Sequence, residues 1–193
     1  AVFKVVTGVS TGALMAPFPF LGPQYAEVPT RLYMTTRRDD VLAGFSAAGI
    51  VFRHDSLARS DPLASLIELY VDASLLAEVA AAHRNGRRLY IGTANLDSRE
   101  FVVWNMGLIA THGDAKALEL FRTIMLASSS VPIVFPPVLV EVEAGGKLYD
   151  EMHVDGFIGA NVFVSVGVLD TPHLAGAFRH SFRLNSFFVE NWP

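Results

Sequence analysis

Ser10 lies in a short segment whose residue types are typical of an activated serine nucleophile. It is the centre of a Gly-x-Ser-x-Gly pattern at residues 8–12, with a short apolar run before it and a helix-forming stretch after it. Such a strand, sharp turn and helix is the sequence form of a nucleophile elbow. We interpret Gly8 and Gly12 as small residues required where the turn leaves no room for Cβ atoms. The N–H groups that begin the helix, including that of Thr11, then favour a developing oxyanion.

A serine hydroxyl is a poor nucleophile without a base, so the base must be found among the histidines and acidic residues. Asp155 is followed by Gly156, which places a carboxylate beside a tight turn at a predicted strand end. Catalytic groups of α/β sheets lie at such ends. An order of serine, aspartate and histidine is also satisfied by Asp155 with His173 or His180. A carboxylate base and a histidine base therefore both stay open on the residues alone.

Composition excludes several classes of function. The chain has 193 residues, which favours a single domain spanning residues 1–193, and its formal net charge of -4 disfavours nucleic acid as a partner. Cysteine is absent, so disulfides and cysteine-based metal sites are excluded. No apolar run reaches the roughly 18 residues of a membrane span. The sequence indicates no compartment.

The elements that must position these residues alternate between strands and helices, which predicts an α/β sheet with some antiparallel pairing. Capping residues and apolar spacing predict helices over residues 62–70, 72–84 and 114–127, with less definite ones over 26–34 and 40–48. Strands are predicted over residues 88–93, 100–104 and 138–143, and the last of these forms a hairpin that turns at Gly145-Gly146. Residues 16–23 contain three prolines, and we expect them to form an apolar loop.

Four segments occur in the order seen in patatin-like phospholipases, and the bacterial members look most similar. They are the elbow at residues 8–12, residues 93–97 with 104–107, residues 127–132 with 135–137, and residues 153–156. The resemblance covers residues 2–163 and leaves residues 164–193 as a tail of unclear role. It implies a patatin-like three-layer α/β sandwich with a mostly parallel central sheet. It also implies hydrolysis of lipid acyl esters by a Ser10–Asp155 dyad, without a metal or other cofactor.

Two features depart from the family pattern. Family members carry a strand and a Gly-rich oxyanion loop before the elbow, and we expect this N-terminal part to be missing here. Weak activity, lower stability than that of a longer chain and a preference for activated short esters are then expected, because a single lost oxyanion donor costs about 10²–10³ in rate. Phe157 stands where the family has Gly or Ala, and we expect its side chain to tilt the carboxylate of Asp155 or narrow the pocket.

The resulting hypothesis is acyl transfer at an apolar pocket lined by residues 17–21 and 130–135. The expected partner is a lipid or ester substrate, with possible transient contact to a membrane surface. Asn95 and Asp97 are interpreted as structural turn residues, and His153 as a supporting or surface residue. A Ser-His-Asp esterase and a catalytically impaired lipid-binding fragment are the alternatives.

Overall fold

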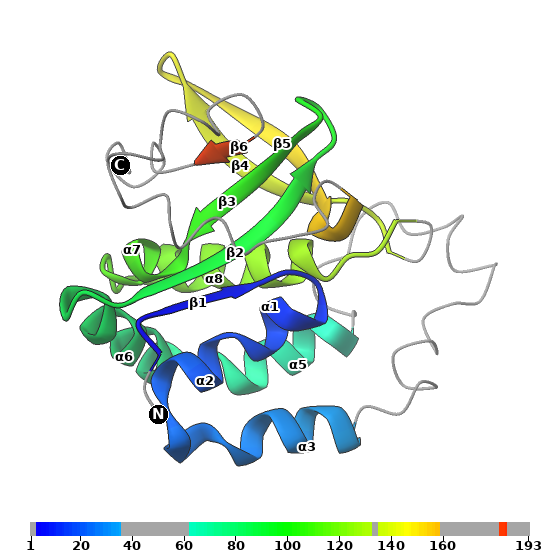
Figure 1. Ribbon diagram of the computed structural model, residues 1–193. Coiled ribbons are helices and arrows are strands. Elements are labelled where there is room, and N and C mark those ends of the chain that lie inside the picture. Colours follow the sequence, from blue (N-terminus) through cyan, green and yellow to red (C-terminus); the bar gives the residue numbers. More distant parts are fainter. Residues whose placement is uncertain (1–2, 36–61, 133–134, 159–181, 185–193) are drawn as a thin grey trace.

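The computed structural model describes residues 3–35, 62–132, 135–158 and 182–184, which form a sheet with helices packed against it (Figure 1). The strands are β1 (Val5–Gly8), β2 (Arg88–Asn95), β3 (Glu100–Asn105), β4 (Val138–Ala144), β5 (Lys147–Asp155) and β6 (Phe182–Leu184). The α-helices are α1 (Thr11–Met15), α2 (Pro17–Leu21), α3 (Glu27–Thr35), α5 (Pro62–Tyr70), α6 (Ala73–Arg84), α7 (Met106–Ala110) and α8 (Ala115–Ser128). Short 3-10 turns, η1 (Pro23–Tyr25) and η2 (Gly156–Ile158), follow α2 and β5.

The strand β2 is the centre of the sheet. It pairs antiparallel with β3 on one edge, and its other edge pairs parallel with β1 and antiparallel with β5. The hairpin of β4 and β5 and the parallel pair of β3 and β6 extend the sheet. The expected α/β class is confirmed. The described strands form a mixed rather than mostly parallel sheet, because short turns join β2 to β3 and β4 to β5, and such turns connect antiparallel strands.

The strands β1 and β5 lie end to end along one edge of β2. Gly8, the last residue of β1, lies opposite Ile91, and Asp155, the last residue of β5, lies opposite Thr93. The strand β3 pairs with both Ile91 and Thr93 from the other edge, so β1 and β5 share the same side of β2. Since β1 runs parallel to β2 and β5 runs antiparallel, their C-terminal ends face each other across Gly92.

The helices pack on the sheet face that carries the fully buried side chains of Leu89, Ile91 and Trp104 (Figure 1). The helix α8 contributes an apolar stripe at helical spacing. Its buried apolar residues are Ala117, Leu120, Phe121, Ile124, Met125 and Ala127. Burial of a large apolar side chain stabilises the fold by about 1.5–3 kcal/mol. The strand ends that meet at Gly92 therefore rest on a rigid core.

Two helices begin where the sequence predicts. The carboxylate of Asp72 accepts a hydrogen bond from the backbone N–H of Leu75 at the start of α6, at 2.8 Å. Asp114 accepts one from the N–H of Ala117 at the start of α8, at 2.7 Å. The hairpin predicted at residues 145–146 is also confirmed, between β4 and β5.

Other expected elements fall partly outside the described ranges. The helix over residues 26–34 is present as α3, whereas the one expected over residues 40–48 lies outside the described residues. Of the tail at residues 164–193, only residues 182–184 are described, and they form β6 beside β3.

The expectation of a loop over residues 16–23 is wrong, because this segment contains the helix α2. Pro17 is its first residue and Pro19 its third. Backbone N–H groups in the first turn of a helix have no intrahelical acceptor, so proline removes no hydrogen bond there. Pro23 likewise begins the turn η1. Prolines confined to first turns are compatible with short helices.

Asp114 offers a test of the α8 N-terminus. We expect Asp114→Ala to lower the free energy of unfolding by about 1 kcal/mol, because it removes an N-cap acceptor. Denaturant titration measures the change, and the exposed Glu119→Ala on the same helix is the control, expected to remain within about 0.5 kcal/mol. Equal effects of the two variants would contradict the capping role.

Candidate active site around Ser10 and Asp155

Ser10 lies in the bend between β1 and α1 and has a strained backbone. Its φ is 57° and its ψ is -132°. A positive φ is uncommon for a residue that has a Cβ atom, and such strain costs about 1–3 kcal/mol and clusters at active sites. This is the strained strand-to-helix turn that a nucleophile elbow requires.

The two glycines of the pattern have different environments. A Cβ atom on Gly8 would lie 2.5 Å from the carbonyl oxygen of Gly12 and 2.9 Å from the Cα of Ala13. A Cβ atom on Gly12 would have no heavy atom within 4 Å. The expectation that a Cβ atom has no room is confirmed for Gly8, which lies under the first turn of α1. The same expectation is wrong for Gly12, because that residue faces open space.

Three consecutive serines at the C-terminal end of α8 tie the elbow in place. The backbone N–H of Ser10 donates to both the carbonyl oxygen and the Oγ of Ser128, each at 3.1 Å. The hydroxyl of Ser128 donates to the carbonyl oxygen of Gly92, at 2.7 Å. Ser129 Oγ lies 3.1 Å from the carbonyl oxygen of Ser10 and 3.0 Å from that of Met125, and its single proton serves these two acceptors. Both backbone groups of Ser10 are thus held by α8.

The third serine of this run holds Asp155. The N–H of Asp155 donates to the carbonyl oxygen of Ser130, at 2.9 Å. The Oδ1 atom of Asp155 accepts a hydrogen bond from the backbone N–H of Phe157, also at 2.9 Å. A Cβ atom on Gly156 would lie 2.7 Å from the carbonyl oxygen of Gly92, so the chain after Asp155 passes closely over β2. Asp155 is 2% exposed and fixed on several sides.

The structure therefore brings the segments of Ser10 and Asp155 to the same place, at Gly92 of β2 and the end of α8. The hydrogen bonds of Ser10 in the described part of the chain involve its backbone, and none joins its hydroxyl to Asp155. Direct hydrogen bonding between the two side chains stays a prediction.

A buried hydrogen-bond chain lies beside Asp155. The indole N–H of Trp104 donates to Thr93 Oγ1, at 2.8 Å. Thr93 Oγ1 is 2.9 Å from Nδ1 of His153, and Nε2 of His153 is 3.3 Å from Oε2 of Glu151. The same Glu151 oxygen accepts a hydrogen bond from Nδ2 of Asn95, at 2.8 Å. Sequence reasoning missed this chain, although a tryptophan in a buried strand signals a need for an acceptor near its N–H.

His153 is completely buried, which makes it a supporting residue and not a surface residue. Burial is the main influence on its titration and lowers the pKa of His153, while the carboxylates of Glu151 and Asp97 act in the opposite direction. The residues opposite His153 are Asn95 on β2 and Val138 on β4, and neither is charged. His153 is therefore neutral near pH 7.

The turn between β2 and β3 is built by the two residues interpreted as structural. Asn95 Oδ1 accepts hydrogen bonds from the N–H groups of Asp97 and Ser98, at 2.8 and 3.0 Å. Asp97 Oδ2 accepts one from the N–H of Met152 on β5, at 2.7 Å. The structural interpretation of both residues is confirmed.

The elbow leaves one N–H group open. Those of Ser10, Gly12 and Ala13 donate to nearby acceptors, whereas that of Thr11 has no hydrogen bond to a described residue.

Phe157 is 69% exposed, and the hydrogen bond that it makes with the Asp155 carboxylate comes from its backbone N–H. Whether the Phe157 ring tilts the carboxylate or narrows the pocket stays a prediction.

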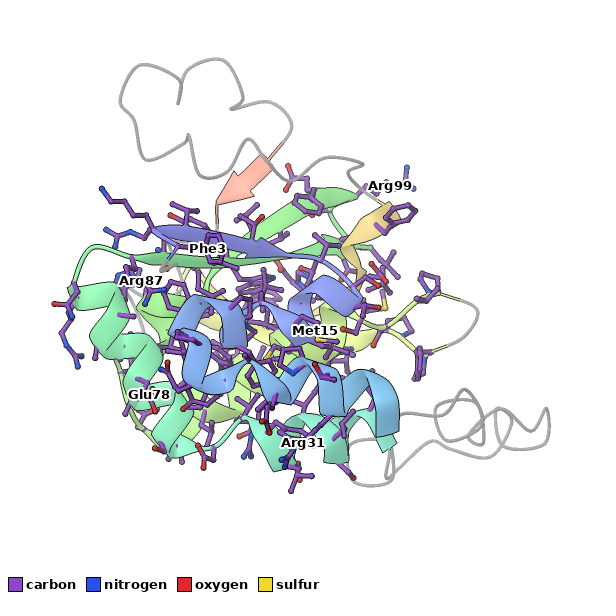
Figure 2. The ribbon with its side chains drawn as sticks, turned by 60° about the horizontal axis from the view of Figure 1, so that its bottom comes forward. Phe3, Met15, Arg31, Glu78, Arg87 and Arg99 are labelled. Carbon is purple, nitrogen blue, oxygen red and sulfur yellow. The ribbon has the colours of Figure 1, made fainter. Side chains whose placement is uncertain are left out.

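Arg87 links the residues just before β1 to the helix α2. Its Nε donates to the carbonyl oxygen of Phe3, at 3.0 Å, and its terminal nitrogen donates to the carbonyl oxygen of Phe20. Its guanidinium lies 4.4 Å from the centroid of the Phe20 ring. Arg87 and Phe3 are close together at one end of β1 (Figure 2).

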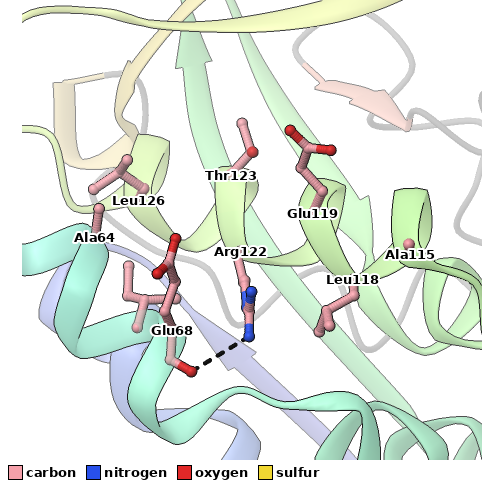
Figure 3. Close-up of a pocket in the computed structure, with 9 residues that line it drawn as sticks. Ala64, Glu68, Ala115, Leu118, Glu119, Arg122, Thr123 and Leu126 are labelled. Carbon is pink, nitrogen blue, oxygen red and sulfur yellow. Dashed lines mark hydrogen bonds between the residues drawn. The ribbon is translucent and has the colours of Figure 1, made fainter. Parts of the chain in front are cut away.

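The described cavity lies away from this site, between α5 and α8 (Figure 3). It has a volume of about 430 Å³, and its lining includes Ile67, Leu118 and Leu126. Arg122 crosses its wall and donates to the carbonyl oxygens of Glu68 and Val71 at the end of α5.

The expectation that residues 17–21 line a pocket over Ser10 is wrong. Pro17, Phe18, Phe20 and Leu21 are buried, and the last three belong to the main hydrophobic core. An amphipathic helix, unlike a loop, turns its apolar side chains into that core.

Two further properties concern cofactors and membranes. In residues 3–35, 62–132, 135–158 and 182–184, no cluster of three or more His, Asp or Glu side chains is arranged to hold a metal ion. None of the helices in these ranges is long and apolar enough to cross a lipid bilayer.

Comparison with known protein families identifies this arrangement. The model of the patatin-like phospholipase family matches residues 1–167, which include Ser10 and Asp155. The chain belongs to the patatin-like phospholipase family. No curated protein matches it significantly. The family supports lipid acyl hydrolase function in general, with a lipid as the substrate, and an α/β fold consistent with a three-layer sandwich.

The two glycines of the elbow provide a matched test. We expect Gly8→Ala to destabilise the protein by about 1–3 kcal/mol, because its Cβ atom would overlap the first turn of α1. Gly12→Ala is expected to be neutral or stabilising by up to about 1 kcal/mol, since alanine is the better helix former. Urea titration distinguishes the two, and a more destabilising Gly12→Ala would contradict the assigned geometry.

The buried neutral His153 predicts an acid-dependent loss of stability. The unfolded chain takes up a proton near the ordinary histidine pKa of about 6.5, whereas the folded chain does so only at lower pH. Below that value the unfolded state binds more protons, so the free energy of unfolding decreases by up to about 1.4 kcal/mol per pH unit.

Denaturant titrations between pH 7 and pH 5 measure this loss. His153→Gln is expected to reduce it, and the exposed His112→Gln serves as the control. An unchanged pH dependence in His153→Gln would show that other groups cause the loss.

Proposed function

We propose that this patatin-like protein is a serine acyl hydrolase that cleaves carboxylic esters of lipids or short-chain esters with a Ser10–Asp155 dyad. The observation that carries the proposal is the meeting of two strand ends at Gly92. One presents Ser10 on a strained bend, and the other presents Asp155 with its carboxylate held by the Phe157 N–H.

The reaction follows ordinary acyl transfer. Asp155 accepts the proton of the Ser10 hydroxyl while that oxygen attacks the ester carbonyl carbon. The bond to the alcohol then breaks, and the alcohol leaves with the proton from Asp155, so that an acyl-enzyme remains. Water gives a proton to Asp155 as it attacks the acyl carbon, and the acid is released while Ser10 regains its proton.

The contacts of His153 support a carboxylate base over a histidine base. Both ring nitrogens of His153 are engaged, one with Thr93 and the other with Glu151. His173 and His180 lie outside the described residues, so the Ser-His-Asp alternative is tested by substitution.

The open N–H of Thr11 is the proposed oxyanion donor, because it is free where the other elbow amides are bonded. An oxyanion binds best where such donors are already oriented. The net charge of -4 favours an uncharged ester or lipid over nucleic acid as the partner, and lipid substrates imply transient contact with a membrane surface.

The dyad predicts a specific pattern of inactive variants. Ser10→Ala and Asp155→Asn should each lower turnover of p-nitrophenyl butyrate by at least about 10³-fold. The first removes the nucleophile and the second removes the base, and neither group works without the other. His173→Ala and His180→Ala should retain activity, and His153→Gln should lower it by far less than about 10³-fold. Labelling by a fluorophosphonate probe, followed by mass spectrometry, identifies the reactive serine.

Two exposed substitutions are the controls for that experiment, Ser74→Ala on α6 and Asp150→Asn on β5. A folded histidine variant as inactive as Ser10→Ala would replace the dyad with a triad. A wild-type protein without turnover or labelling would favour a lipid-binding fragment.

A further inference from the structure

We propose that the hydroxyl of Thr93 is a positioning group that holds Asp155 for proton transfer, through the buried hydrogen-bond chain from Trp104 to Glu151. The inference rests on the proposed role of Asp155 as the base. It assigns a role to polar groups that the reaction itself does not use.

The pairing of β5 shows why such a group is needed. On its β4 side, β5 pairs over residues 147–153, whereas on its β2 side only His153, Val154 and Asp155 pair, with Asn95, Ala94 and Thr93. The end of β5 that carries Asp155 is thus joined to the strand beside the elbow by a short ladder. Few backbone hydrogen bonds, each with a net contribution of about 1 kcal/mol, therefore join this end of β5 directly to β2.

Side-chain hydrogen bonds reinforce this short ladder. Thr93 lies directly opposite Asp155, and its hydroxyl reaches along the same face of the sheet to His153, two residues earlier on β5. Asn95 makes the same kind of link to Glu151, at 2.8 Å. Both links join β2 to β5, so they resist a shift of β5 relative to β2 and therefore to β1.

The chain has a single consistent direction of donation. The indole N–H of Trp104 only donates, so the Thr93 oxygen accepts from it. The Glu151 carboxylate only accepts, so Nε2 of the neutral His153 donates to it, and Nδ1 is left to accept the Thr93 proton. This tautomer is assigned from the network. Thr93, Trp104 and His153 are all 0% exposed, so water cannot replace a lost partner.

Loss of the Thr93 hydroxyl should therefore move Asp155. Without that hydroxyl, the indole N–H of Trp104 loses this acceptor and Nδ1 of His153 loses this donor, and the loss of buried hydrogen bonds drives the surrounding structure to rearrange. A base must lie within about 2.6–3.2 Å of the oxygen whose proton it takes. A misplacement of about 1 Å can lower a rate by about 100-fold.

The test compares Thr93→Val, which has the same shape without a hydroxyl, with Thr93→Ser, which keeps the hydroxyl. Thr93→Val should lower kcat for p-nitrophenyl butyrate, and the rate of Ser10 labelling by a fluorophosphonate, by about tenfold or more. KM should change by less than about twofold, because the hydroxyl does not touch substrate. Thr93→Ser should recover most of both rates.

Val102→Ala is the matched control for simple destabilisation. Val102 is 0% exposed and is paired with Thr93 from the β3 side, and its side chain has no hydrogen-bonding group. All rates are normalised to the folded fraction at the assay temperature, measured by circular dichroism. Thr93→Val and Val102→Ala may then be compared directly at equal amounts of folded protein.

A second pair keeps the proposal testable if Thr93→Val does not fold. Glu151 is partly accessible, with 19% of its side chain exposed, so its variants are expected to fold. Glu151→Ala removes the acceptor of His153 and should lower the labelling rate by about threefold or more, whereas Glu151→Gln should retain most of it.

The outcomes separate this inference from the proposed function. The positioning role alone would be overturned by two results together. Rates per folded molecule would be equal in Thr93→Val, Val102→Ala and wild type, and the two Glu151 variants would have equal rates. Absence of both turnover and Ser10 labelling in the wild-type protein would overturn the proposed function and this inference with it.

Discussion

The site depends on one constraint, the sharing of a single edge of β2 by two strands that run towards each other. Gly8 ends β1 opposite Ile91, and Asp155 ends β5 opposite Thr93, so that Gly92 is left between them. The hydroxyl of Ser128 bonds the carbonyl of Gly92 and accepts from Ser10 N–H. A side chain thus bridges the gap between the two strand ends. Ser10 and Asp155, which are 145 positions apart in the sequence, are brought to the same place.

Local sequence patterns predicted the parts of this site, because each part has a local physical cause. The elbow needs a small residue at position 8, where a Cβ atom would overlap the following helix turn. The Asp-Gly ending of β5 and the aspartate caps of α6 and α8 are equally local. Each pattern is set by contacts within a few residues, so it is visible without knowledge of the rest of the fold.

The contacts between these parts could not be predicted in the same way. Nothing near Gly92 in the sequence indicates that β1 and β5 lie on the same edge of β2, because strand pairing depends on the whole sheet. The bonds of the serines at 128–130 to Ser10 and Asp155 likewise depend on the fold and not on the local sequence. The proline content of residues 17–21 indicated a loop, although Pro17 and Pro19 both lie in the first turn of α2. Proline is tolerated in that turn, so its number alone does not exclude a helix.

The serine run also explains how a site assembled from distant segments stays aligned. Ser128 and Ser129 hold the two backbone groups of Ser10, and Ser130 holds the N–H of Asp155. Because the three serines are consecutive, Ser10 and Asp155 are both held by the same end of α8.

Sliding of β5 against β2 would change the separation of Ser10 and Asp155, because β1 and β5 share one edge of β2. The backbone resists that motion over the three pairs of the ladder between residues 93–95 and 153–155, and through the hydrogen bond from the N–H of Leu96 to the carbonyl oxygen of Met152. The side-chain links of Thr93 to His153 and of Asn95 to Glu151 cross the same boundary. A neutral His153 suits this position because its unprotonated nitrogen accepts the Thr93 proton, whereas a protonated ring would present a second donor to the Thr93 oxygen.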